Sequence, residues 1–243
     1  IAAGEVVQRP SSVLKELLEN SIDANSSKIK IIIKNAGKNL IQVIDDGIGM
    51  SRNDMYKSFI KHATSKINKI DDVFSINSMG FRGEALAAIS SVSMIEMSSS
   101  KLNENDGYFI EINGGKVITE KELIGNKGTS IKVQNLFYNV PARRNFLKSD
   151  FVELRHIINV FNSIALSNNE IEFSFINNDE EIFYLKKESL KKRIISIFGE
   201  KIRENLIPIS EDTQIANLKG FILKPDFAKK SRINQYIFVN NRS

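Results

Sequence analysis

The 243-residue sequence contains no cysteine and only two histidines, His62 and His156. Without cysteine the chain can form neither disulfides nor thiolate metal sites, and two histidines are too few for a zinc centre of the usual kind. The absence of cysteine also agrees with a reducing compartment. Stability must therefore come from an ordinary core, for which a hydrophobic content of 42% is sufficient.

Long apolar runs are also absent. No run reaches the roughly 18 residues that a membrane-spanning helix needs. The opening segment IAAGEVVQRP has neither the basic region nor the continuous apolar region of a secretory signal. We therefore expect no membrane partner, and a protein that is cytoplasmic if the host is bacterial, the favoured case, or nuclear if the host is eukaryotic.

Net positive charge is missing from the first three quarters of the chain. Residues 1–185 carry 21 basic and 23 acidic side chains, whereas residues 186–243 carry 13 and 6. A segment as basic as the second favours a polyanion such as DNA through counterion release, although a solvated surface can have the same composition. The change in composition near Lys186 predicts one domain over 1–185 and a second over 186–243.

Hydrophobic periodicity predicts alternating helices and strands. The predicted helices cover residues 10–24, 83–90, 150–166 and 188–204, with a short helix after the capping pair Ser51 and Asp54. The predicted strands cover residues 29–34, 40–44, 92–98, 108–112, 116–122, 130–135, 170–176, 181–185, 216–223 and 235–239. This order predicts an α/β sandwich with a mostly antiparallel sheet, followed by the start of a second domain.

One face of the first predicted helix is polar. Asn20 and Asp23 follow Glu16 by four and seven residues, so the three side chains fall within about 60° of one another, opposite the apolar stripe. A carboxylate four residues from an amide suits a site for a metal ion and phosphate. Glu16 would act as a general base on water, and the Asn20 carbonyl oxygen would be a ligand of Mg²⁺. A solvent-facing polar stripe has the same spacing, so this helix alone leaves both interpretations open.

An acidic, glycine-containing segment ends the strand predicted over residues 40–44. Asp45 can accept a hydrogen bond from an exocyclic amine, and Gly47 and Gly49 let backbone approach a ligand closely. A dinucleotide-binding turn is excluded because Arg52 stands where the third glycine belongs. The lysine-containing phosphate loop of other nucleotide-binding proteins is absent from the sequence, so a bound nucleotide needs another architecture.

Two later segments can contact phosphates. Residues 80–86 lead from a glycine-flanked loop into a helix, where free N–H groups and the helix dipole favour anions. Residues 62–66 bring hydroxyls and a cation ahead of the weakly patterned stretch 68–80, which we expect to form a lid. Loops without a ligand contain similar glycines, and His62 itself reads as a packed or surface side chain.

These segments, in this order, resemble the four motifs of the GHKL ATPases, which include gyrase B subunits, Hsp90 chaperones, histidine kinases and MutL proteins. The matching positions are Glu16 and Asn20, Asp45 with Gly47 and Gly49, Gly80 with Gly83, and Gly128 with Thr129. Within this superfamily, the segments 1–10, 62–66, 80–86 and 137–144 look like those of the MutL, MLH and PMS proteins of DNA mismatch repair. The resemblance is dense over residues 1–150 and loose beyond them.

The resemblance implies ATP and Mg²⁺ as ligands. Glu16 is then the catalytic residue, Asn20 the ligand of Mg²⁺, and Asp45 the residue that reads the adenine amino group. The other residues expected to contact the nucleotide are Gly47, Gly49, Thr64, Ser65, Lys66, Gly80, Phe81, Arg82, Gly83, Glu84, Ala85, Leu86 and Thr129. Arg82 and Glu84 can instead form an ion pair within the lid, and Arg143 and Arg144 can either anchor a loop or contact DNA.

The resemblance also implies a fold and a function. The family fold is a two-layer sandwich of the GHKL (Bergerat) type, followed by a ribosomal-protein-S5-like α/β domain, and we expect this sequence to contain a truncated form of the second domain. Members use ATP to form homodimers or heterodimers that act as a clamp near DNA, and slow hydrolysis reopens the clamp. The implied partners are DNA, contacted at its backbone without base readout, a MutS-type mismatch recognition protein, and downstream repair enzymes.

The sequence departs from the family pattern at its ends and at two internal positions. The family usually has segments before residue 1 and after residue 243, so we expect a fragment that binds ATP but hydrolyses it poorly. Asn241 replaces the usual glycine, and Asp46 replaces the usual asparagine. We expect the extra charge of Asp46, beside the adenine pocket, to weaken binding modestly.

Two alternatives stay open. Another GHKL enzyme, such as a gyrase-like subunit or a chaperone, would share Asn20 and Asp45 but should lack the surroundings of Arg82 and the pair Arg143 and Arg144. A scaffold that uses ATP only as a structural switch, or that has lost ATP binding, would have no need of Glu16 as a base.

Overall fold

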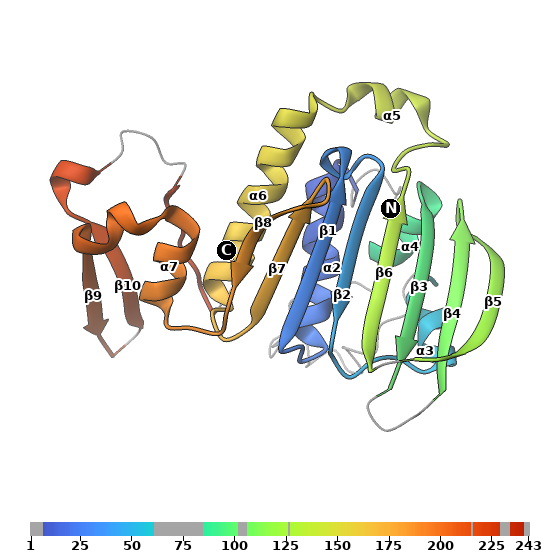
Figure 1. Ribbon diagram of the computed structural model, residues 1–243, viewed down its shortest axis with the longest axis horizontal. Helices are drawn as coiled ribbons and strands as arrows, with labels where there is room; N and C mark the ends of the chain where they lie inside the picture. The colour runs from blue at the N-terminus through green and yellow to red at the C-terminus, as the bar shows by residue number, and fades with distance from the viewer. Residues whose placement is uncertain are drawn as a thin grey trace.

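A computed structural model describes residues 7–60, 85–101, 106–125, 127–214, 216–228 and 234–240. Eight strands form one large sheet: β1 (Lys28–Lys34), β2 (Leu40–Asp45), β3 (Met94–Ser100), β4 (Asp106–Asn113), β5 (Lys116–Ile124), β6 (Gly128–Gln134), β7 (Glu172–Asn177) and β8 (Glu180–Leu185). Their order across the sheet is β5-β4-β3-β6-β2-β1-β7-β8 (Figure 1). Among the described residues, the only parallel neighbours in this sheet are β1 and β7, so the predicted antiparallel character is confirmed.

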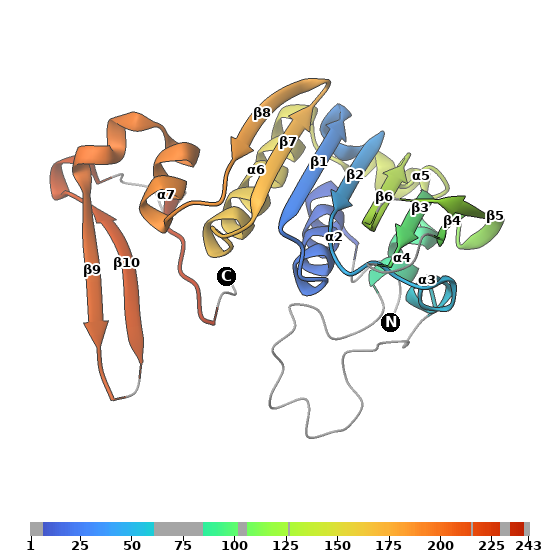
Figure 2. The ribbon, with the colours of Figure 1, turned by 60° about the horizontal axis from the view of Figure 1, so that its bottom comes forward.

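Helices cover one face of the large sheet. The described α-helices are α2 (Pro10–Asp23), α3 (Arg52–Ser58), α4 (Ala85–Ser91), α5 (Pro141–Phe146), α6 (Asp150–Ser167) and α7 (Leu190–Phe198). α2 packs against α6 and β2, and Figure 2 shows α4 on the same side of the sheet. The two-layer sandwich expected from the sequence is therefore confirmed.

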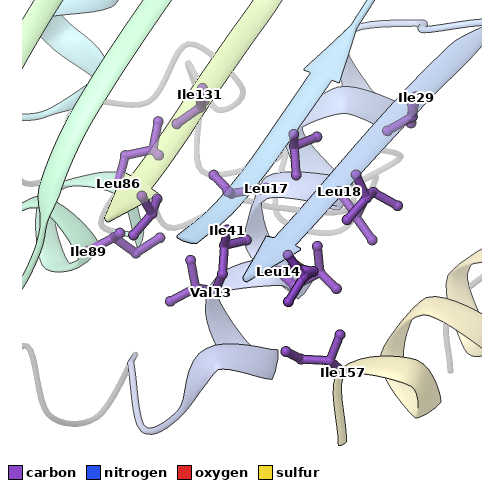
Figure 3. Close-up of a cluster of buried hydrophobic side chains, with 14 of the residues drawn as sticks. Val13, Leu14, Leu17, Leu18, Ile29, Ile41, Leu86, Ile89, Ile131 and Ile157 are labelled. Carbon is purple, nitrogen blue, oxygen red and sulfur yellow. The ribbon is translucent and has the colours of Figure 1, made fainter. Parts of the chain in front are cut away.

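The core lies between this helix layer and the sheet, because both have one apolar side. The apolar stripe of α2 is fully buried, and β1 alternates buried isoleucines with exposed lysines. Figure 3 shows how side chains from α2, α4, α6 and three strands meet; its labelled residues are Val13, Leu14, Leu17, Leu18, Ile29, Ile41, Leu86, Ile89, Ile131 and Ile157. This packing fixes the polar edge of α2 beside the ends of the central strands.

Two local predictions are confirmed at the turns. β1 and β2 form an antiparallel hairpin, joined by the short 3-10 helix η1 (Asn35–Gly37). The hydroxyl of Ser51 accepts a hydrogen bond from the Asp54 N–H over 3.2 Å, as a capping residue does at the start of α3.

The part of the chain after β8 differs from its prediction in three ways. The helix predicted over 188–204 is split at Gly199, whose φ of +93° ends α7 before the 3-10 helix η3 (Glu200–Asn205). A separate two-stranded sheet pairs β9 (Leu206–Asp212), which was not predicted, with β10 (Asn217–Leu223); a 3-10 helix, η4 (Pro225–Phe227), follows. The strand predicted over 235–239 is wrong, since the described residues there contain only an isolated bridge at Val239.

The missed strand has a physical explanation. Pro208 lies inside β9, and a proline cannot donate to a strand ladder, so the local sequence argues against a strand. Among the described residues, β9 pairs only with β10, and an edge strand tolerates proline. None of the described helices is long and apolar enough to cross a membrane.

The fully buried Arg193 of α7 ties the second part of the chain to the first. Its guanidinium lies 2.8 to 3.1 Å from four carbonyl oxygens, those of Ala165, Asn169, Ile171 and Lys186. It also contacts the Glu188 carboxylate at 3.2 Å. These carbonyls come from the end of α6, the start of β7 and the segment after β8, so one side chain holds α7 against the end of the large sheet.

Candidate functional site

The polar face of α2 lies at the edge of the core. Glu16 and Asn20 are half-buried and one helical turn apart, and each already makes an interaction within the protein. Since Leu17 and Leu18 anchor the opposite side of the helix in the core, the two polar side chains are held at a fixed place beside the sheet.

Asp45 at the end of β2 is joined directly to α2. The Ser21 hydroxyl donates to Oδ2 of Asp45 over 2.8 Å, and the Gly47 N–H donates to Oδ1 over 3.0 Å. The segment after Asp45 is tied to the same helix, because the Ile48 N–H donates to the Ala24 carbonyl over 3.0 Å. The first two sequence motifs therefore meet at the C-terminal end of α2.

Burial raises the pKa of Asp45 above its ordinary value of 3.8. Hydrogen bonds from the Ser21 and Ser26 side chains and from the Gly47 and Thr129 backbone offset only part of that effect. Burial therefore disfavours the charged carboxylate even though the protein supplies several donors to it. One more donor, such as the amino group of a bound base, would stabilise the charged form and lower the pKa.

Three strands bring polar side chains to the same level of the sheet. Asp45 on β2 is the register partner of Thr129 on β6, and Thr129 is the partner of Ser99 on β3. The hydroxyl oxygens of Ser99 and Thr129 are 2.9 Å apart, and both residues are buried. The predicted pair Asp45 and Thr129 is therefore brought together, and Ser99 extends it by one strand.

Ser21 and Ser99 are not predicted from the sequence. Ser21 continues the apolar stripe of α2 and is 3% exposed, so a polar residue at a core position was the available signal. Ser99 stands in a run of three serines at the end of β3 and gave no such signal. Its place became visible only through the strand register.

The carboxylate of Asp46 caps the beginning of β1. It accepts hydrogen bonds from the Ser27 N–H at 2.7 Å, the Ser27 hydroxyl at 2.5 Å and the Lys28 N–H at 2.9 Å. Burial raises its pKa, but these hydrogen bonds outweigh burial and hold the pKa below the ordinary value. The charge that we expected to act on the adenine pocket is instead bound by backbone and hydroxyl donors at the start of β1.

The glycines of the second motif allow close approach to the protein's own backbone. A Cβ atom on Gly49, whose φ is +68°, would lie 1.9 Å from the Ser100 carbonyl oxygen. A Cβ atom on Gly47 would lie 2.7 Å from the Cβ of Ala24. Both positions therefore require glycine for packing, whatever the ligand.

The helix α4 carries the last two residues of the predicted phosphate segment. Ala85 is half-buried, while the Leu86 side chain is buried in the core near Ile131 (Figure 3). The other residues predicted in this region, Thr64, Ser65, Lys66, Gly80, Phe81, Arg82, Gly83 and Glu84, lie outside the described residues, as does His62. Contacts from all of them to a nucleotide stay predictions.

No group of three acidic or histidine side chains that could hold a metal occurs among the described residues. A pocket of about 210 Å³ lies away from α2, between α3 and the outer strands β4 and β5. Its described lining includes Arg52, Tyr56 and Tyr108 and none of the residues predicted to bind nucleotide.

Arg143 and Arg144 of the segment 137–144 have different surroundings. The guanidinium of Arg143 lies 5.9 Å from the ring centre of the buried Phe137, an arrangement suited to anchoring α5. Arg144 is exposed, and so is Phe146 on the same helix. Arg143 thus fits the anchoring interpretation, while Arg144 is accessible to a partner.

Two family models match this chain. Residues 8–137 match the family described as histidine kinase-, DNA gyrase B-, and HSP90-like ATPase. Residues 194–243 match the family described as DNA mismatch repair protein, C-terminal domain. The resemblance to the GHKL superfamily is confirmed, and the second match removes a gyrase-like subunit or a chaperone as an alternative.

Curated relatives cover the whole chain. The MutL protein of Christiangramia forsetii is 54% identical over 242 residues, and that of Flavobacterium psychrophilum is 53% identical over 242 residues. The alignments include 100% of this chain but only 39% and 40% of those proteins. The chain therefore spans about two fifths of the length of the curated relatives that it matches.

Solved structures give the same family. The Aquifex aeolicus MutL ATPase domain complexed with ADP is 30% identical, with a TM-score of 0.67 over 85% of this chain and 73% of that chain. A crystal structure of the N-terminal domain of a DNA repair protein is 26% identical, with a TM-score of 0.83 over 99% of this chain and 75% of that chain. Together with the matched ATPase family, these relatives show that the chain belongs to the MutL family of DNA mismatch repair proteins.

Proposed function

We propose that this chain binds ATP with Mg²⁺ and hydrolyses the ATP slowly, as the ATPase region of a DNA mismatch repair protein. The observation that carries this proposal is the half-buried Asp45 carboxylate, which Ser21 and Gly47 hold at the end of β2 beside the polar edge of α2. The adenine amino group is the donor that this carboxylate fits. The ATPase domain of the Aquifex aeolicus MutL protein, which is 30% identical to this chain, was solved in complex with ADP.

The residues divide the work along α2 and its neighbours. Asp45 accepts from the adenine amino group, Asn20 gives its amide oxygen to Mg²⁺, and Glu16 orients or deprotonates the attacking water. A hard cation prefers oxygen ligands, so an amide oxygen with phosphate oxygens is a suitable set, and the cation neutralises phosphate charge when bound. The nucleotide is enclosed by Gly47, Gly49, Thr64, Ser65, Lys66, Gly80, Phe81, Arg82, Gly83, Glu84, Ala85, Leu86 and Thr129.

ATP acts as a switch in this proposal. Binding favours a closed homodimer, or a heterodimer with another MutL-type chain, near DNA, and hydrolysis reopens it. The segment 186–243 forms a second domain beyond the boundary near residue 185, and its 13 basic against 6 acidic side chains supply contacts to the DNA backbone. The partners of the protein in this proposal are a MutS-type protein and downstream repair enzymes.

Because the curated relatives are bacterial, we assign the protein to the cytoplasm.

Turnover tests the enzymatic half of the proposal. We expect the chain to bind ATP and release phosphate in the presence of Mg²⁺, and Glu16→Ala to lower the rate by about 100-fold or more while binding persists. Glu19→Ala is the matched control, since Glu19 lies on the same helix in a 3.8 Å ion pair with Lys15 and has no proposed role in chemistry. Equal rates for Glu16→Ala and the unmodified chain would remove Glu16 as the base, and ATP binding without turnover in the unmodified chain would leave a nucleotide-controlled scaffold.

Salt dependence tests the DNA half. Binding of duplex DNA to backbone-contacting lysines and arginines weakens steeply as salt rises, because released counterions must be bound again. Affinity measured by fluorescence anisotropy at several salt concentrations should fall, and it should not depend on DNA sequence. An affinity that does not change with salt contradicts a role for the basic segment.

A further inference from the structure

Ser99 belongs to none of the four sequence motifs, yet its hydroxyl contacts the segments that contain the second and the fourth motif. Ser99 is 3% exposed on β3, at the register position beside Thr129, which is itself beside Asp45 on β2. The Met50 N–H, at the end of the second motif, donates to the Ser99 hydroxyl over 2.9 Å. The carbonyl oxygen of Gly128 and the hydroxyl of Thr129, in the fourth motif, lie at 3.1 and 2.9 Å.

These three contacts determine where the hydroxyl protons go. A serine hydroxyl donates one hydrogen bond and accepts two. The Met50 N–H can only donate, and the Gly128 carbonyl can only accept, so all three contacts are satisfied only when Ser99 donates to Gly128 and accepts from Thr129. The reverse arrangement would point two oxygens, of Ser99 and Gly128, at each other without a proton.

The satisfied arrangement leaves Thr129 as an acceptor. Its proton is directed at Ser99, so its oxygen has only lone pairs to offer to any other group. The carboxylate of Asp45, one strand away, is also an acceptor. Two adjacent acceptors match the amino group at position 6 of adenine and oppose the oxygen that guanine carries there.

We propose that Ser99 is a positioning residue that fixes the Thr129 hydroxyl as an acceptor and thereby makes the site prefer adenine over guanine nucleotides. This inference rests on the proposed binding of ATP. Without the Ser99 oxygen, the Thr129 hydroxyl can rotate and donate to the guanine oxygen, so the barrier against GTP falls. The Gly49 to Met50 backbone also loses its anchor on β3.

The test compares ATP and GTP affinities of the chain and its variants by equilibrium binding. We expect the unmodified chain to prefer ATP, and Ser99→Ala to lower the ratio of ATP to GTP affinity by about tenfold, the effect of one neutral hydrogen bond. Ser99→Thr keeps the hydroxyl and should keep the preference. Ser98→Ala is the matched control, because Ser98 directly precedes Ser99 on β3 and its side chain points to the opposite face of the sheet.

The outcomes separate this inference from the function on which it rests. An unmodified chain that does not bind ATP overturns the proposed function. If it binds ATP but Ser99→Ala weakens both nucleotides equally, Ser99 has only a structural role and the inference is wrong. Should Ser99→Ala fail to fold by thermal melting, Ser99→Cys supplies the same comparison, since a thiol is a weak donor and acceptor. Loss of the preference in Ser99→Thr also contradicts the inference.

Discussion

The hydroxyl of Ser21 donates to Oδ2 of Asp45 over 2.8 Å, and this contact joins two motifs that lie 24 residues apart. Ser21 directly follows Asn20 but points into the core, whereas Asn20 lies on the half-buried polar edge of α2. One helix therefore carries the proposed phosphate-side residues on one face and a support of the adenine-side carboxylate on another. A displacement of α2 would affect both ends of a bound nucleotide.

Asp45→Asn tests the adenine assignment. The Ser21 hydroxyl and the Gly47 N–H donate to different oxygens of Asp45, so an amide must oppose one of them with its own N–H groups. We expect ATP affinity to fall by about 100-fold or more, because the adenine amino group loses its carboxylate acceptor and faces the amide N–H groups of asparagine. Calorimetric titration with ATP measures this. Asp46→Asn should bind ATP as the unmodified chain does; if Asp45→Asn does so too, the assignment is wrong.

Asp46→Asn has a second, pH-dependent consequence. Hydrogen bonds from Ser27 and Lys28 outweigh burial and hold the pKa of Asp46 below 3.8, so its charged form stabilises the folded protein above that pH, and this stability is lost as the pH falls through the folded-state pKa. We expect Asp46→Asn to lower the free energy of unfolding by about 1 kcal/mol at neutral pH. Urea unfolding at neutral and at acidic pH should show the difference shrinking in acid. A difference that grows in acid contradicts the sign.

Asp45 should respond to pH in the opposite sense. Burial raises its pKa above 3.8, so the folded state holds the proton more tightly than the unfolded state. The folded protein therefore loses stability as the pH rises through the interval between 3.8 and the folded-state pKa. Asp45→Asn removes this loss. The variant should therefore be relatively more stable than the unmodified chain above the interval than below it, which the same urea series can measure.

Gly49→Ala tests the close approach of two loops. The new Cβ would lie 1.9 Å from the Ser100 carbonyl oxygen, and the φ of +68° adds strain for any residue with a side chain. We expect a loss of at least about 2 kcal/mol in the free energy of unfolding. Gly220→Ala on β10 is the control, because its Cβ would meet only Ile209 at 3.9 Å. Equal melting temperatures for the two variants would contradict the predicted clash.

Arg193→Met tests the junction between the two parts of the chain. Methionine fills similar space but removes the guanidinium that donates to four carbonyl oxygens and to Glu188. Removing one member of a buried charged network costs about 3 to 5 kcal/mol, so a marked drop in denaturant resistance is expected. Arg203→Ala is the control, since Arg203 forms an exposed pair with Glu200 and its loss should change little. A small effect of Arg193→Met would mean that the junction is held by apolar packing instead.

Local sequence signals predicted most of the fold. Local patterning located all eight strands of the large sheet. Burial on one face imposes the alternation in strands such as β1 and β6, whereas the edge strand β5 is exposed along almost all of its length. The helix predicted over 188–204 failed at Gly199, and β9 was missed at Pro208, since each depends on a backbone angle or an edge position that composition does not encode. The candidate site shows the same difference. The sequence predicted the motif residues Asn20, Asp45 and Thr129, whereas the contacts of Ser21 and Ser99 with them became visible only in the structure.

The amino-acid sequence by itself predicted the eight strands of the large sheet, most of the helices, the four ordered motifs and the family, because periodicity and motif spacing are local properties of the chain. Only the tertiary structure decided which polar groups meet. Strand pairing between β2, β6 and β3 places Asp45, Thr129 and Ser99 at one level of the sheet, and the packing of α2 turns Ser21 toward Asp45. A shift of one residue in that register would send these side chains to the other face, so their meeting depends on pairing between distant segments.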